Sequence, residues 1–175
     1  TSPFLPKSPY AVAKASCFWL ANSYRQAYRQ FVCTGILFNH ESFLRPQRYV
    51  TQKIVSAAKL IADGSKEKLQ LGRLDIIRDW GWAPEYVEAM WLMLQNKIPE
   101  DFVIATGESF KLEDFVRYAF EGLGLDWKEH VEISNSLSRP NDLLVSRASP
   151  DRARDILGWQ AKSKMPDVVK QMLNS

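Results

Sequence analysis

The stretch FVCTGILF, residues 31–38, decides the fold class of this chain. It is short and almost continuously apolar, which is typical of a strand buried on both faces of a parallel sheet. The run ends abruptly in four polar residues, Asn39, His40, Glu41 and Ser42. Ligand-binding loops of open α/β sheets follow parallel strands in this way. We therefore predict a buried parallel strand with a ligand-binding loop at its carboxyl end.

Helical and strand patterns alternate on both sides of this run. Ser8 and Pro9 mark a helix start, with serine as N-cap and proline in the first helical position, and the helix runs to about Gln30. Further along we predict helices over 51–63, 84–95, 112–122, 149–158 and from 166, strands over 68–71, 101–106 and 131–133, and a loop at 139–142. This alternation predicts an α/β fold, with a sheet that is incomplete because only two apolar runs resemble central strands.

Composition places the chain among single globular domains. Its 175 residues are 46% hydrophobic and 25% charged, which excludes collagen-like and disordered classes. No stretch approaches the roughly 20 apolar residues of a membrane helix, so we expect no membrane association. The two cysteines supply neither a disulfide framework nor a metal-ligand cluster. We therefore expect no metal site and a reducing, cytoplasmic setting.

Positive charge is concentrated in the first third of the chain. Residues 1–60 carry eight Lys or Arg against the single acid Glu41, whereas the whole chain has a net charge of +3. Such a region could meet nucleic acid, a phosphorylated small molecule or an acidic protein surface. The basic residues are scattered, and no helix resembles one that reads a DNA groove, so we expect no nucleic-acid partner.

The pair Tyr10 and Lys14 is the clearest candidate for chemistry. Four residues of separation on a helix bring the phenol and the ammonium to the same face. A cation beside a tyrosine favours the phenolate, which is the form that a general base needs. The alternative is an exposed i,i+4 pair without a catalytic role.

Several motifs together carry a family resemblance. SPYAVAK at 8–14, GILFNHES at 35–42, RDWG at 78–81, DFVIATG at 101–107 and Arg139-Pro140 resemble the extended short-chain dehydrogenase/reductase superfamily, and within it the GDP-mannose 4,6-dehydratase family. The resemblance implies the C-terminal part of an NAD(P)-binding Rossmann fold with the smaller α/β substrate-binding domain. Residues 1–40 would be the last part of the cofactor domain. Residues 41–175 would be mainly the sugar-nucleotide region, with some segments returning to the Rossmann sheet.

The resemblance also implies roles for individual residues. Tyr10 would be the acid/base at the sugar C4 hydroxyl, and Lys14 would hold the nicotinamide ribose. His40 and Arg45 match cofactor-binding positions, with NADP as the expected cofactor and NAD as the alternative. The substrate-binding set is Asn39, Lys53, Leu71, Gly72, Arg78 and Arg139, with Asp142 in place of a Glu that accepts hydrogen bonds from the nucleotide ribose.

In the family the sugar of GDP-mannose is oxidised at C4 by hydride transfer to NADP, water is lost across C5 and C6, and the hydride returns at C6. The resemblance places the required Thr-x-Glu segment and the glycine fingerprint ahead of Thr1, so we expect these 175 residues alone to be inactive. It also implies a homodimer or homotetramer. The loop FLRPQ at 43–47 departs from the paired-arginine loop that supports tetramers in the family.

Other interpretations remain open from the sequence. The parent activity could be that of a related nucleotide-sugar reductase or epimerase, or the chain could be a non-catalytic sugar-nucleotide-binding module. His40 could serve as a hydrogen-bonding residue only, and Arg78 and Arg139 could pair with Asp79 and Asp142 on the surface. We expect packing roles for six further residues: Trp80, Trp82, Trp91, His130, Cys17 and Cys33.

Overall fold

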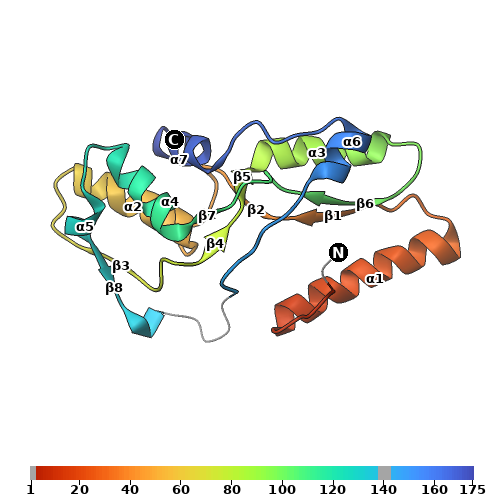
Figure 1. Cartoon of the computed structure of the whole chain (residues 1–175), viewed down its shortest axis with the longest axis horizontal. Coiled ribbons are helices and arrows are strands. Elements are labelled where there is room, and N and C mark those ends of the chain that lie inside the picture. The colour runs from red at the N-terminus through yellow and green to blue at the C-terminus, as the bar shows by residue number, and fades with distance from the viewer. Residues whose placement is uncertain (1–2, 138–142) are drawn as a thin grey trace.

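The predicted buried strand is present as β1 (Thr34–Leu37), which pairs in parallel with β6 (Asp101–Ile104). The structure is a computed structural model and describes residues 3–137 and 143–175. Helix α1 (Pro9–Tyr28) lies on one side of the β1–β6 pair, and α3 (Ala83–Gln95) and α6 (Asp151–Leu157) lie on the other (Figure 1). Helices on both faces of a parallel pair are the layers of a doubly wound α/β fold.

Helix α1 begins as the sequence predicts. The Ser8 hydroxyl accepts a hydrogen bond from the Ala11 backbone N–H at 3.1 Å, and the helix ends at Arg29, which adopts φ 52°. Its far end is anchored by Arg25, which donates to the Val32 carbonyl at 2.8 Å and pairs with Asp101 on β6. None of the α1 residues is buried. The helix therefore presents apolar side chains to solvent.

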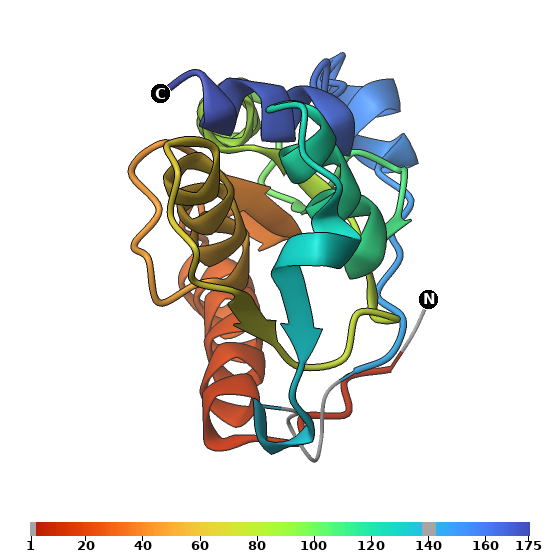
Figure 2. The same cartoon turned by 90° about the vertical axis from the view of Figure 1, so that its left-hand side faces the viewer.

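A second lobe holds the larger core. Helices α2 (Val50–Ala62), α4 (Leu112–Glu121) and α7 (Met165–Leu173) pack together beside the parallel pair β3 (Leu69–Leu71) and β8 (Val131–Ile133) (Figure 2). The short helix α5 (Trp127–His130) leads into β8, and a 3-10 turn at Asn135–Leu137 follows it. Apolar faces of α2, α4 and α7 form one cluster with Trp80. A separate cluster joins α3, β6 and the segment around Trp159.

Short strands connect the two lobes, and here one prediction is wrong. Residues Asn39–Glu41 form the strand β2, parallel to β5 (Trp80–Trp82), where the sequence predicted a loop. Beside them, β4 (Ile77–Arg78) pairs antiparallel with β7 (Phe110–Lys111). Although several residues of this segment are polar, their backbone N–H and C=O groups are paired between strands. Because Glu41 and Trp80 are buried, these groups need hydrogen-bond partners within the protein.

The other predicted helices and strands are present with ends shifted by a few residues, and the predicted loop at 139–142 lies outside the described residues. Cys17 and Trp91 were expected to pack but are exposed, whereas the half-buried Cys33 thiol donates to the Met93 carbonyl at 3.5 Å. Within residues 3–137 and 143–175, no helix combines the length and apolarity needed to cross a membrane.

Candidate functional site

Two adjoining pockets lie where β1 and β2 meet the start of α1. The first, the central pocket, has a volume of about 600 Å³ and is lined by Tyr10, Asn39, Glu41, Arg45, Tyr49, Val50, Thr51, Gly72, Arg73, Ile76, Arg78, Trp80, Leu112 and Leu137. The second, the side pocket, has a volume of about 350 Å³ and is lined by Tyr10, Leu37, Phe38, Asn39, His40, Arg45, Tyr49 and Ser146. Tyr10, Asn39, Arg45 and Tyr49 belong to both walls. Segments far apart in sequence thus converge on one cleft.

Tyr10 stands in the first turn of α1, and its side chain reaches both pockets. It is 72% exposed, so the phenol is open to a ligand. The Lys14 ammonium lies 5.8 Å from the centre of the Tyr10 ring, as the i,i+4 spacing predicts. Lys14 lines neither pocket in this structure. The two side chains lie on the same face of α1.

His40 lies in the side pocket with a fixed orientation. Its Nδ1 is 2.8 Å from the Phe38 carbonyl oxygen, and because that oxygen can only accept, Nδ1 carries the hydrogen in this contact. The neutral ring then offers Nε2 as an acceptor. The ring also contacts Tyr86, with centroids 4.9 Å apart.

Arg78 and Asp79 have different surroundings. Arg78 lines the central pocket and donates through Nη1 to the Ile77 carbonyl at 2.8 Å. The Asp79 carboxylate is fully buried and accepts hydrogen bonds from the backbone N–H groups of Thr106 and Gly107, both at 2.9 Å. Burial raises the pKa of the Asp79 carboxyl, although these N–H groups and Lys164 favour its charged form. Asp79 is therefore a buried residue that joins the RDWG segment to the loop after β6, not a surface carboxylate.

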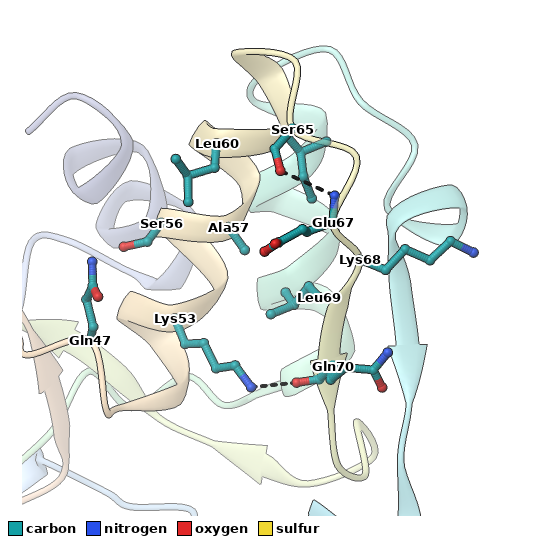
Figure 3. Close-up of a pocket in the computed structure, with 11 residues that line it drawn as sticks. Gln47, Lys53, Ser56, Ala57, Leu60, Ser65, Glu67, Lys68, Leu69 and Gln70 are labelled. Carbon is teal, nitrogen blue, oxygen red and sulfur yellow. Dashed lines mark hydrogen bonds between the residues drawn. The ribbon is translucent and has the colours of Figure 1, made fainter.

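The remaining predicted substrate-binding residues do not lie together. Gly72 faces the central pocket, whereas the Leu71 side chain is buried in the core. Lys53 lies instead in a third, outer pocket of about 470 Å³ between α2 and β3, where its ammonium donates to the Gln70 carbonyl at 2.6 Å (Figure 3). Arg139 and Asp142 lie outside the described residues.

Several residues of the central pocket were not predicted as site residues, among them Glu41, Tyr49 and Arg73. Arg73 is held by Asp75 through two contacts of 2.7 Å. A signal for Glu41 existed in the sequence, since it is the single acid among the first 60 residues. Over the described parts of the chain, no group of three or more His, Cys, Asp or Glu could hold a metal ion.

Comparison with known proteins identifies the family. A family model described as GDP-mannose 4,6 dehydratase matches residues 1–172. The chain belongs to this family. GDP-mannose 4,6 dehydratase 1 of Arabidopsis thaliana is 44% identical over 174 residues, covering 99% of this chain and 48% of the relative. The human GDP-mannose 4,6 dehydratase is 39% identical over 192 residues, covering 100% of this chain and 52% of the relative.

The chain therefore spans about half the length of the dehydratases that it matches. Among solved structures, the dTDP-glucose 4,6-dehydratase of Bacillus anthracis in complex with NAD aligns with a TM-score of 0.87 at 19% identity, covering 98% of this chain and 53% of that one. RMD from Pseudomonas aeruginosa, complexed with NADPH, aligns with a TM-score of 0.80 at 21% identity, covering 97% and 55%. These likenesses establish the α/β fold.

Proposed function

We propose that the central pocket binds GDP-mannose and that the chain supplies the substrate-binding part of a GDP-mannose 4,6-dehydratase. The observation that carries the proposal is the convergence of Tyr10, Asn39, Arg45, Gly72 and Arg78 on one pocket. A tyrosine beside a lysine suits proton transfer, and guanidinium groups suit a diphosphate, because their planar forks donate to phosphate oxygens in pairs. Membership of the family supports the choice of substrate.

In this proposal each group has a distinct task. Tyr10 acts as a phenolate that takes the proton of the sugar C4 hydroxyl, and the neighbouring Lys14 ammonium holds the nicotinamide ribose and stabilises the phenolate charge. Arg78 binds the diphosphate from the wall of the central pocket, which Ile76 and Trp80 also line. Arg139 and Asp142, outside the described residues, are proposed to extend the nucleotide contacts. Lys53, in the outer pocket, and Leu71, in the core, take no part in this proposed site.

We propose NADP as the cofactor, with NAD as the alternative, held on the side pocket by Tyr10, His40 and Arg45. The residues present fit such a group, because an acceptor nitrogen, a guanidinium and a phenol face one 350 Å³ space. When bound, the nicotinamide ring supplies the hydride acceptor. The lobe formed by α1, β1, β6, α3 and α6 is then the last part of the cofactor domain, and the other lobe is mainly the sugar-nucleotide region.

The proposal extends to assembly and compartment. Exposed apolar side chains of α1, such as Trp19 at 59% and Leu20 at 57%, support association into a homodimer or homotetramer. Free thiols at Cys17 and Cys33 are in keeping with a reducing cytoplasm.

A hybrid protein tests the activity. In it, this chain replaces the 174 matching residues of the Arabidopsis dehydratase 1. With NADP present, we expect GDP-mannose to be converted to GDP-4-keto-6-deoxymannose, identified by mass spectrometry as loss of one water. A folded hybrid that binds GDP-mannose but forms an epimer or a reduced sugar would replace the dehydratase proposal by the related activity.

A further inference from the structure

Glu41 is a buried charged residue for which the proposed mechanism has no task. It is 1% exposed, at the end of β2 and in the wall of the central pocket. Its register partner across the parallel pair is Trp82, so the backbone at this point is fixed by strand pairing. Burying a carboxylate costs free energy unless a cation or hydrogen bonds compensate. The side chain that offsets the cost of burying this carboxylate therefore indicates the role of Glu41.

That side chain is Arg45. Its Nε lies 2.8 Å from Glu41 Oε2, and its Nη2 donates to Glu41 Oε1 at 3.4 Å. The shorter contact is an ion pair whose N–H is not directed at the oxygen, so the hydrogen bond of this pair is the longer one. Burial raises the pKa of the Glu41 carboxyl, while Arg45 and Thr51 favour its charged form.

The backbone between the two residues and a neighbouring ring also restrain Arg45. The Arg45 N–H donates to the Ser42 carbonyl at 3.1 Å, which closes the turn that returns residue 45 over β2. The Arg45 guanidinium lies 4.0 Å from the centre of the Tyr49 ring, a cation–π contact. One face of the guanidinium is thus covered by Tyr49 and one edge by Glu41.

The remaining edge faces the ligand space. Arg45 lines both the central and the side pocket, and its side chain is 26% exposed. Its Nη1 has no hydrogen-bond partner among residues 3–137 and 143–175. A guanidinium held by the Nη2 hydrogen bond, the ion pair at Nε and the Tyr49 ring presents Nη1 in one direction, which lowers the cost of ordering it around a phosphate.

We propose that Glu41 is a positioning residue: its carboxylate holds Arg45 in the wall shared by the two pockets, with Nη1 directed at a phosphate group of the bound ligand. The inference rests on the proposed function and adds a residue to it. The phosphate could come from the nucleotide sugar or from the dinucleotide cofactor, since Arg45 faces both spaces.

Calorimetric titration of the Arabidopsis hybrid, in which this chain is joined to the part of the relative that it does not cover, tests this inference. GDP-mannose and NADPH are titrated separately into the unsubstituted hybrid, Glu41→Gln, Arg45→Ala and the double variant. We expect Glu41→Gln to weaken binding of at least one ligand about tenfold, as for one misplaced charge-assisted hydrogen bond. In the Arg45→Ala background the same substitution should have no further effect, because Glu41 acts through Arg45.

The ligand whose affinity falls identifies the source of the phosphate. A merely structural role of Glu41 would give equal losses in the unsubstituted hybrid and in the Arg45→Ala variant, and that additivity would overturn the inference. Unchanged affinity of Glu41→Gln for both ligands would overturn it as well, with the proposed function intact. Absence of GDP-mannose binding by the unsubstituted hybrid would overturn both. If Glu41→Gln does not fold by circular dichroism, Glu41→Asp, which shortens the reach of the carboxylate, takes its place in the cycle with the same expectations.

Discussion

The Lys14 ammonium lies 5.8 Å from the centre of the ring of Tyr10, the residue one helical turn earlier in α1 that lines both pockets. In the Arabidopsis hybrid, Tyr10→Phe should lower turnover at least about a hundredfold, because it removes the proton-transfer group. GDP-mannose affinity should hardly change, since little contact area is lost. Tyr24→Phe is the matched control, because Tyr24 lies on the same helix and packs against Tyr28. Unchanged turnover of Tyr10→Phe would remove this residue from the mechanism.

Arg78 should contribute to binding of the nucleotide diphosphate. Arg78→Ala is expected to weaken GDP-mannose binding to the chain by about tenfold or more, through loss of a charge-assisted hydrogen bond. Arg117→Ala is the control, because Arg117 pairs with Asp114 and Glu121 on α4 and lines none of the three pockets. Calorimetry measures both variants. Equal affinities would place Arg78 outside the binding site.

Gly81 should not tolerate a side chain. It lies opposite His40 in the β2–β5 register, and an added Cβ would lie 2.6 Å from the Tyr86 hydroxyl oxygen. Because Tyr86 is fully buried, Gly81→Ala should lower the free energy of unfolding by about 1–3 kcal/mol, measured by urea denaturation. Tyr86→Phe in the same background should restore little of the loss, because the ring carbons Cε2 and Cζ contact the added Cβ as well. A Gly81→Ala chain of unchanged stability would show that Tyr86 moves freely.

The buried Asp79 predicts a pH dependence of stability. Burial raises its pKa in the folded chain, so the folded state binds the proton more tightly than the unfolded state. Its contribution to stability is therefore complete below the unfolded value of about 3.9 and is lost as pH rises through the folded pKa. Asp79→Asn should flatten this fall in the free energy of unfolding. Substitution of the exposed Asp63 by Asn is the control and should leave the pH dependence of the free energy of unfolding as it is in the unsubstituted chain. An Asp79→Asn chain with the original slope would contradict the assignment.

Residues differ in how far the sequence predicts their structure. The runs at 31–38 and 101–106 were predicted as strands because buried parallel strands have continuous apolar sequences. The strands β2, β4, β5 and β7 were missed, since two or three residues are too few to show a period and their partners are distant in sequence.

The sequence also predicts only part of the candidate site. Tyr10, Asn39, Arg45, Gly72 and Arg78 were predicted on family resemblance and meet in one pocket. Lys53 faces the outer pocket, because its place on α2 and its bond to the Gln70 carbonyl direct it there. Glu41 was missed because a charged residue indicates exposure unless its partner is known, and Arg45 reaches it through a turn rather than along a helix.

Nuclear magnetic resonance of the 175-residue chain during titration with GDP-mannose measures nucleotide-sugar binding residue by residue. If the central pocket binds this ligand, the backbone amide signals of Asn39, Gly72 and Arg78 shift in a saturable manner, while those of α6 and α7 stay in place. No saturable shift, or shifts confined to the outer pocket around Ser56 and Ser65, would contradict the assignment of the central pocket as the nucleotide-sugar site.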